Sequence, residues 1–145
     1  MGLRQVTAQE HDNVQMVQRI YAAFGRGDIP AILQALAPDV EWMMSGSAEI
    51  AFAGARQGRE QVVECFTAIA QTVDVLHFEP QEFIAQGDTV VVLGVEQLRV
   101  KATGKVAENP WVMAFAFRNG QVVRFREFDD TGALAAAFRP GLKVT

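Results

Sequence analysis

Side chains that bind metals or cross-link a fold are scarce in this sequence. Its 145 residues include one cysteine, Cys65, and two histidines, His11 and His77. A single cysteine cannot form an intrachain disulfide, which fits a reducing compartment, so we expect a cytoplasmic location. The histidines lie far apart without a cysteine or carboxylate at ligand spacing, and we find no glycine-rich phosphate loop. We therefore expect neither a metal site nor a cofactor.

Positive charge and long apolar runs are also scarce. The net charge is −4 at pH 7, so the chain has no basic field that would attract nucleic acid, and we expect no nucleic-acid partner. No stretch approaches the ~20 apolar residues that a membrane span requires. Residues 1–13 contain no apolar run and therefore predict no signal peptide. We expect no membrane partner.

Hydrophobic residues, in contrast, make up 50% of the sequence, and charged residues make up 21%. Such proportions are typical of a globular protein. A chain of this length buries roughly 70% of its unfolded surface when it folds. It needs no disulfide or structural metal for stability, and we predict one domain over residues 1–145.

The first half of the chain has helical periodicity and helix-capping residues. Thr7 and Glu10 have the spacing of a capping box, which predicts a helix that begins near residue 8. Gly25 and Gly27 are expected to end this helix, and Asp28 to cap a short second one. The sequence further predicts a strand over 40–45, a loop over 46–58 and a third helix over 59–73.

The second half alternates apolar and polar residues, which is typical of strands. Asn119 and Gly120 give the strongest turn signal, because Asn-Gly suits a tight hairpin. Strands are predicted near 75–85, 89–101, 106–118 and 121–129, and a last helix near 131–138. This order indicates an α+β fold. We expect a curved antiparallel sheet in a half-cone, covered by the N-terminal helices and enclosing an apolar pocket.

Three segments resemble the SnoaL-like polyketide cyclase and ketosteroid isomerase-like family, within the nuclear transport factor 2-like superfold. They are VQRIYAAFGRGDIPAILQALAPDVEW (17–42), GREQVVECF (58–66) and NPWVMAFAFRNGQVVRFREFDDTGAL (109–134). The resemblance spans about residues 14–138 and implies a SnoaL-like domain with a pocket for a small hydrophobic molecule. Because the superfold hosts many activities, and also proteins without a known one, the resemblance implies the pocket and leaves the reaction open.

The resemblance also identifies the positions at which ketosteroid isomerases carry their proton-moving groups. The family's tyrosine, base and protonated aspartate fall on Ile20, Met44 and Met113, which are all apolar. Without a base or hydrogen-bond donors at these positions, steroid isomerisation by that set of residues is not expected. Tyr21 lies one residue, or about 100°, from the tyrosine position. We interpret it as a core or interface tyrosine.

Glu127 is the carboxylate that the resemblance places on the pocket side of the last strand. SnoaL-like cyclases carry an acid/base aspartate at the position that matches it. Apolar neighbours would raise the pKa of Glu127, so it could act as a general acid or base on an enolisable or aldol-type carbonyl substrate. In the alternative interpretation, Glu127 is structural and forms a salt bridge at the pocket rim or a hydrogen bond to the backbone.

The expected pocket lining follows from side-chain alternation and from the resemblance. Its predicted ligand-binding members are Ile20, Phe24, Trp42, Met44, Phe66, Gln97, Trp111, Met113, Phe115 and Phe125. Gln97 would contribute an amide donor and acceptor. Asp129 and Asp130 are interpreted as residues at the start of the last helix, where negative charge is favourable.

Glu96 is assigned to the other face of its strand, together with Val92 and Leu98, and is interpreted as structural or part of an interface. That face would expose Val92, Leu98 and Val100 to water. We therefore expect a homodimer.

Two hypotheses about function remain open at this point. The first is a cofactor-independent enzyme, cyclase- or isomerase-like, that acts on a small hydrophobic carbonyl compound through Glu127. The second is a non-catalytic ligand-binding or dimerisation protein with a degenerate active site. It rests on the apolar residues at positions 20, 44 and 113.

Overall fold

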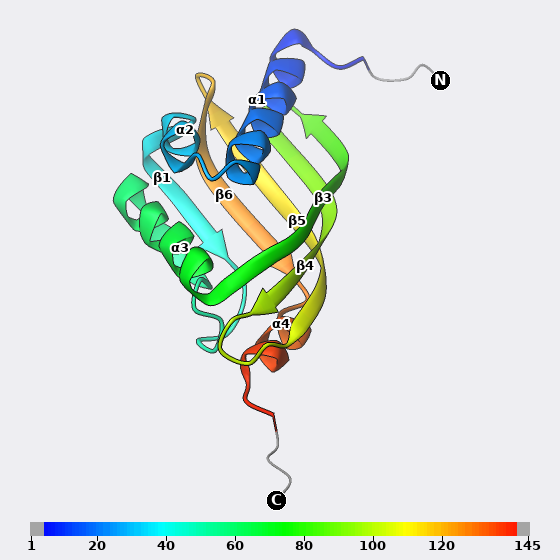
Figure 1. Cartoon of the computed structure of the whole chain (residues 1–145). Coiled ribbons are helices and arrows are strands. Elements are labelled where there is room, and N and C mark those ends of the chain that lie inside the picture. The colour runs from blue at the N-terminus through cyan, green and yellow to red at the C-terminus, as the bar shows by residue number, and fades with distance from the viewer. Residues whose placement is uncertain (1–4, 142–145) are drawn as a thin grey trace, which may run out of the picture.

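The computed structural model describes residues 5–141 of the chain. The expectations about a signal peptide and about one domain over residues 1–145 include residues 1–4 and 142–145, which lie outside the described residues. The helices are α1 (Ala8–Gly25), α2 (Ile29–Gln34), α3 (Gly58–Thr72) and α4 (Thr131–Phe138). The strands are β1 (Leu36–Met44), β2 (Gly54–Gln57), β3 (Val73–Gln86), β4 (Thr89–Val100), β5 (Val106–Arg118) and β6 (Gln121–Asp129). Figure 1 shows α1, α2 and α3 over one face of a curved sheet, with α4 near one end of β4 and β5.

The six strands form one sheet in the order β2-β1-β6-β5-β4-β3. The predicted meander from β3 to β6 is confirmed, because each of these strands pairs antiparallel with the next. β1 joins the open edge of β6 in parallel, so the α+β fold has a mixed sheet. Alternation within a strand does not predict this pairing, because it carries no information about which distant strand lies alongside. Parallel partners are joined by a long crossover, so they are not neighbours in the sequence. The prediction of a loop over 46–58 was wrong at β2, a short edge strand without an apolar face.

β3 bends over the concave face of the sheet because it carries two irregularities. Its register against β4 shifts between Val75 and His77 and again between Pro80 and Glu82. Each shift inserts one extra residue, which increases the local twist and bends the strand. β3 therefore runs from the end of α3 across the front of the sheet towards α1 (Figure 1).

The start of α1 is the predicted capping box. The backbone N–H of Glu10 donates to Oγ1 of Thr7 at 3.1 Å, and the backbone N–H of Thr7 donates to Oε1 of Glu10 at 2.9 Å. Glu10 is almost fully buried, and its other oxygen, Oε2, accepts from the backbone N–H of Gly87 at 2.7 Å. The same carboxylate thus caps the helix and holds it to the β3–β4 turn.

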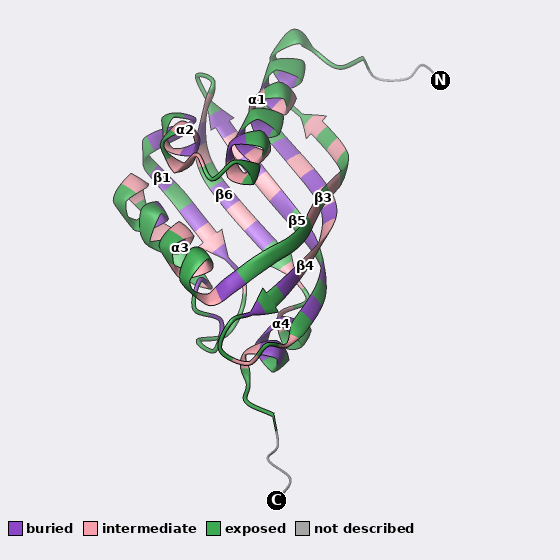
Figure 2. Cartoon of the chain, in the orientation of Figure 1, coloured by how far each residue is buried: buried purple, intermediate pink, exposed green. Residues whose placement is uncertain are grey.

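The core lies between the concave face of the sheet and the helices, and buried residues alternate along the strands (Figure 2). On β4 the assignment of the two faces was wrong. Val92, Leu98 and Val100 are buried against the helices, with at most 3% of their surface exposed. Because the alternate residues of β4, such as Leu93 and Val95, are equally apolar, the sequence pattern contains no signal for the direction of this strand.

A bulge interrupts the alternation at the start of β6. Val122 is fully buried, although its alternation with Phe125 predicts the opposite face. The register between β5 and β6 shifts between Ala116 and Phe117, so that Val123 is an extra residue on β6. A bulge of this kind reverses the alternation on one side of the extra residue.

Candidate functional site

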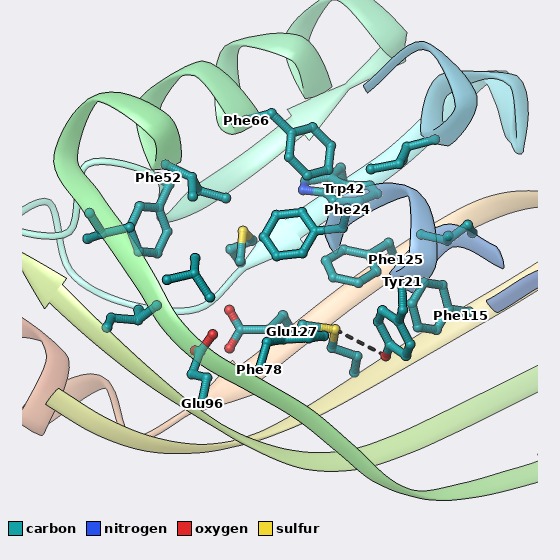
Figure 3. A pocket seen from close by; sticks show the side chains of 18 residues that line it. Tyr21, Phe24, Trp42, Phe52, Phe66, Phe78, Glu96, Phe115, Phe125 and Glu127 are labelled. Atoms are coloured by element: carbon teal, nitrogen blue, oxygen red, sulfur yellow. Dashed lines mark hydrogen bonds between the residues drawn. The ribbon is translucent and has the colours of Figure 1, made fainter. Parts of the chain in front are cut away.

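A pocket lies between the concave face of the sheet and helices α1, α2 and α3 (Figure 3). The space open to the centres of water molecules is about 70 Å³, so side chains fill most of it. Predicted lining residues that the structure places around it are Ile20, Phe24, Trp42, Met44, Phe66, Met113, Phe115 and Phe125. Within the described part of the chain, Glu96 and Glu127 are the carboxyl groups that line this pocket.

Trp111 and Gln97, which were predicted to line the pocket, lie elsewhere. The indole ring of Trp111 is stacked on Phe78, with ring centroids 5.0 Å apart and an angle of 11° between the planes. It can lie there because Gly94, its partner across the strands, has no side chain. Gln97 is half-buried on the outer side of β4, opposite Glu108 of β5. Both corrections follow from the arrangement of β4, which the sequence pattern leaves open.

Glu127 points into the pocket from β6, beside Met113 of β5 (Figure 3). Only 2% of its surface is exposed, and its Oε1 has no hydrogen-bond partner within residues 5–141. Burial raises the pKa of Glu127 to about 10, and the neighbouring Asp129 and the charge of Glu96 raise it further. Because this pKa lies well above 7, Glu127 is protonated at neutral pH.

Glu96 is the second carboxyl group at this end of the pocket, and its predicted outward direction was wrong. In Figure 3 its carboxyl group lies close to that of Glu127 and faces the same space. Burial raises the pKa of Glu96 to about 7, a hydrogen bond from Asn109 lowers it, and the charge of Asp129 raises it. Glu96 is therefore partly ionised at neutral pH, whereas Glu127 holds its proton.

The side chain of Asn109 links the carboxyl groups of this region. Its Oδ1 accepts from the backbone N–H of Asp130 at 3.0 Å, which fixes the orientation of the amide. Its Nδ2 consequently faces two carboxylates and donates to Oε2 of Glu96 at 2.7 Å and to Oδ2 of Asp129 at 3.0 Å. Asn109 is 1% exposed, so these hydrogen bonds are shielded from water.

The two aspartates that follow have different roles. Asp130 is the N-cap of α4, as predicted, and its Oδ1 accepts from the backbone N–H of Ala133 at 3.1 Å. Asp129, in contrast, is the last residue of β6 and accepts from Asn109, so its predicted place as a helix-start residue was wrong. The start of α4 is thereby connected through Asn109 to Glu96.

Tyr21 lies in the pocket lining, beside the Ile20 position that the resemblance identifies. Its hydroxyl donates to Sδ of Met113 at 3.4 Å, and burial raises the pKa of the phenol, which stays protonated. A thioether is a weak acceptor. The hydroxyl can therefore turn to a better acceptor on a ligand.

Cys65 is a buried thiol on α3. It is fully buried, and its Sγ donates to Sδ of Met44 at 3.3 Å. Burial is the largest effect on the thiol and raises its pKa. Cys65 is thus unsuited to act as a nucleophile at neutral pH.

A surface groove between the end of α1 and helix α3 adjoins the pocket. Its volume is about 430 Å³, and it shares Phe24, Phe66, Ile69, Val73 and Val75 with the pocket lining. The rings of Phe24 and Phe66, with centroids 6.1 Å apart, line both spaces. A ligand that reaches the pocket from this groove would pass between these two rings.

Metal-ligating side chains do not cluster in the described part of the chain: residues 5–141 contain no group of three or more His, Cys, Asp or Glu residues that could hold a metal ion. None of the helices in this range is long and apolar enough to span a membrane.

Residues 17–125 match the family model of the SnoaL-like domain. The chain belongs to this SnoaL-like family. An NTF2-like protein from Burkholderia xenovorans LB400 is 37% identical and superposes with a TM-score of 0.82, covering 90% of this chain and 98% of that chain.

Two further proteins are similar to this chain over most of their length. The uncharacterized protein Rv0034 from Mycobacterium tuberculosis (strain ATCC 25618 / H37Rv) is 30% identical over 126 residues, which is 87% of this chain and 95% of the relative. TerC, whose crystal structure was obtained with polyporic acid, is 28% identical with a TM-score of 0.79, covering 88% of this chain and 98% of that chain.

Sequence reasoning missed the carboxylate and amide network next to the pocket of this SnoaL-like domain. One signal was present: Asn109 alternates with Trp111 and Met113, and Asp129 alternates with Glu127, so both pairs share a face. Alternation on β5 and β6 does not place Glu96, because its direction depends on which face of β4 meets the helices.

Proposed function

We propose that this protein binds a small hydrophobic carbonyl compound in the pocket and catalyses a cofactor-independent proton transfer through Glu127. The observation that carries the proposal is the position of Glu127: 2% exposed, facing the pocket, with Oε1 lacking a partner among the described residues. A protonated carboxyl group in an apolar pocket can donate its proton to a carbonyl oxygen at neutral pH. Tyr21, whose hydroxyl donates to Sδ of Met113, is a second hydrogen-bond donor in the pocket lining.

The crystal structure of TerC with polyporic acid supports a small-molecule ligand, because TerC shares this fold at 28% identity. The apolar lining supports a largely hydrophobic ligand, with its polar group at the end where Glu96 and Glu127 lie.

The alternative is a SnoaL-like domain that holds an apolar ligand without reaction. Its support is the set of apolar side chains at Ile20, Met44 and Met113, which line the pocket and cannot move protons. In this case Glu127 would keep its proton only to reduce the energy of its own burial. The two functions differ in whether exchange of a substrate proton depends on Glu127.

The test uses two compact, enolisable ketones, 2-indanone and 2-tetralone, in D₂O near pD 7.5. We expect the wild type to accelerate deuterium uptake at the carbon next to the carbonyl, measured by ¹H NMR against buffer alone. Since general acid–base groups contribute about 10²–10⁴-fold, Glu127→Gln should lose most of this acceleration.

The matched control for this test is Glu108→Gln, which makes the same chemical change at an exposed position of β5. It should keep the wild-type rate. A Glu127→Gln variant with full activity would exclude the catalytic role of Glu127 and favour the binding function.

We further propose that the protein forms a homodimer through the outer face of the sheet, with other residues than the sequence predicted. Leu93, Val112 and Phe128 lie side by side across β4, β5 and β6 on this face. Val112 and Phe128 are 36% and 45% exposed. An apolar row of this kind, continued by Ile84 and Val91, is a typical self-association surface.

A further inference from the structure

Two carboxyl groups with different surroundings meet at the polar end of the pocket. Glu96 comes from β4 and Glu127 from β6, and β5 lies between these strands. Both side chains line the same space, and Figure 3 shows their carboxyl oxygens close together there. A ligand at this end of the pocket therefore contacts two carboxyl groups.

Hydrogen bonding distinguishes the two groups. Oε2 of Glu96 accepts from Nδ2 of Asn109 at 2.7 Å, a hydrogen bond that stabilises the ionised form. Within residues 5–141, Oε1 of Glu127 has no partner, and the neighbouring Asp129 carries an oxygen, Oδ1, that is likewise without a donor. An ionised Glu127 would place a second buried negative charge beside Asp129, so the surroundings favour an ionised Glu96 and a protonated Glu127.

We propose that Glu96 and Glu127 form a proton-transfer pair, in which Glu96 is the base, Glu127 is the acid and Asn109 is the residue that positions and ionises Glu96. This inference rests on the proposed function, because it assigns Glu127 the same catalytic role. It adds a second catalytic residue, from a different strand, and it names the direction in which the protons move.

The step balances without a cofactor. The Glu96 carboxylate takes a proton from the carbon next to the ligand carbonyl, and the electron pair of that C–H bond forms a carbon–carbon double bond. The carbonyl π electrons take the proton of Glu127, which gives an enol, a protonated Glu96 and an ionised Glu127. Exchange follows when protonated Glu96 trades its proton for one from the solvent and delivers that solvent-derived proton to the same carbon. Delivery to another carbon of a conjugated enol gives an isomer, and in both cases Glu127 recovers its proton from the enol hydroxyl.

This arrangement also selects the class of substrate. The body of the ligand would contact aromatic and aliphatic side chains, so it must be apolar. The reacting end would face one ionised and one protonated carboxyl group, so a neutral carbonyl is accepted and a carboxylate is repelled. We therefore infer a neutral ketone or aldehyde with an acidic C–H bond next to its carbonyl.

The groups that face the pair explain its expected pH dependence. Asp129 of β6 faces both carboxyl groups, and Asn109 of β5 faces Glu96. The charge of Glu127, when that group is ionised, raises the pKa of the Cys65 thiol on α3. Tyr21 of α1, protonated because burial raises its pKa, and the uncharged Phe78 of β3 complete the surroundings. The active form, with Glu96 ionised and Glu127 protonated, is most populated between their pKa values of about 7 and about 10.

The test extends the deuterium-exchange measurement on 2-indanone and 2-tetralone to Glu96→Gln, an isosteric change that leaves no buried charge unpaired. We expect the exchange rate of Glu96→Gln to fall at least ~100-fold, as for Glu127→Gln, and that of Glu108→Gln to stay at the wild-type value. The wild-type rate should rise with pD up to a maximum and fall again at higher pD.

Asn109→Leu tests the positioning role. Loss of its hydrogen bond should raise the pKa of Glu96, so the rising limb of the rate profile should move to higher pD. A purely structural role would lower the rate at all pD values without moving either limb. Thermal unfolding checks that the variant folds; if it does not, the Glu96→Gln profile decides the inference.

The outcomes separate the two proposals. Loss of exchange in Glu127→Gln with a wild-type rate in Glu96→Gln would overturn the proton-transfer pair and leave the proposed function in place. Wild-type rates in both variants, or a wild type that accelerates exchange of neither ketone, would overturn both proposals.

Discussion

At the scale of single residues, the pocket contains two carboxyl groups, those of Glu96 and Glu127, whose ionisation is made unfavourable by burial. Glu127 is 2% exposed, and no cation is among the causes of its pKa shift. An ionised Glu127 would therefore be neither solvated nor paired with a positive charge. The protein accepts a buried polar group at this position, as catalytic sites often do at the expense of stability.

This arrangement predicts how stability depends on pH. The unfolded chain releases the Glu127 proton near the ordinary value of 4.5, whereas the folded chain holds it up to about pH 10. The folded state binds more protons between these values, so the free energy of unfolding should fall as the pH rises through this range. Glu96 adds a contribution of the same sign between pH 4.5 and about 7.

Glu127→Gln should remove most of this slope. We expect the variant to be more stable than the wild type at pH 8 by about 1–3 kcal/mol and to differ little from it near pH 5. Urea unfolding at both pH values measures the difference. Parallel stability curves for the two proteins would contradict the raised pKa of Glu127.

At the scale of single elements, β4 shows how the absence of a side chain shapes the site. A Cβ atom on Gly94 would lie 2.3 Å from Cζ2 of Trp111 and 2.6 Å from the backbone oxygen of Glu79. Glycine therefore lets the indole ring lie across β4 against Phe78, and it keeps Trp111 out of the pocket.

Gly94→Ala should displace Trp111 and lower the free energy of unfolding by about 1–3 kcal/mol, the usual effect of overpacking a core. Chemical unfolding followed by tryptophan fluorescence would measure both effects. Gly25→Ala is the matched control, because a Cβ atom on Gly25 meets no atom within 4 Å and alanine favours the helix. Equal stabilities of the two variants would contradict the close packing at Gly94.

At the scale of the whole molecule, helices α1, α2 and α3 cover only the concave face of the sheet (Figure 2). On the outer face, the row of Leu93, Val112 and Phe128 continues across three strands. Burial of this row against a second copy would remove apolar surface from water.

The dimer proposal predicts a mass in solution of twice the 15.9 kDa chain mass at micromolar concentration. Val112→Glu should place two charges in the interface and produce a monomer, as measured by light scattering or sedimentation. Val63→Glu, at a residue of α3 with nearly the same exposure (38% against 36%), should leave the dimer intact. A monomeric wild type would overturn this proposal.

The sequence predicted those features of the fold that depend on neighbouring residues. Thr7 and Glu10 form a capping box through contacts three residues apart, and Asp130 caps α4 in the same local way. Asn119 and Gly120 adopt φ angles of 52° and 77°, as their hairpin turn requires. Alternation on β5 and β6 grouped Met113 with Phe115 and Phe125 with Glu127, because side chains two residues apart on a regular strand share a face. The family resemblance predicted that these residues face the pocket, which they line.

Only the tertiary structure decided the features that depend on which strands meet and in which register. The helices could cover either apolar face of β4, and this choice places Glu96 inside the pocket and Gln97 outside it. The hydrogen bonds of Asn109 to Glu96 and Asp129 join three strands, so no spacing along the chain encodes them. Residue types and local turns were therefore determined by the sequence by itself, whereas the pairing of carboxyl groups required the register of β4, β5 and β6, which long-range packing sets.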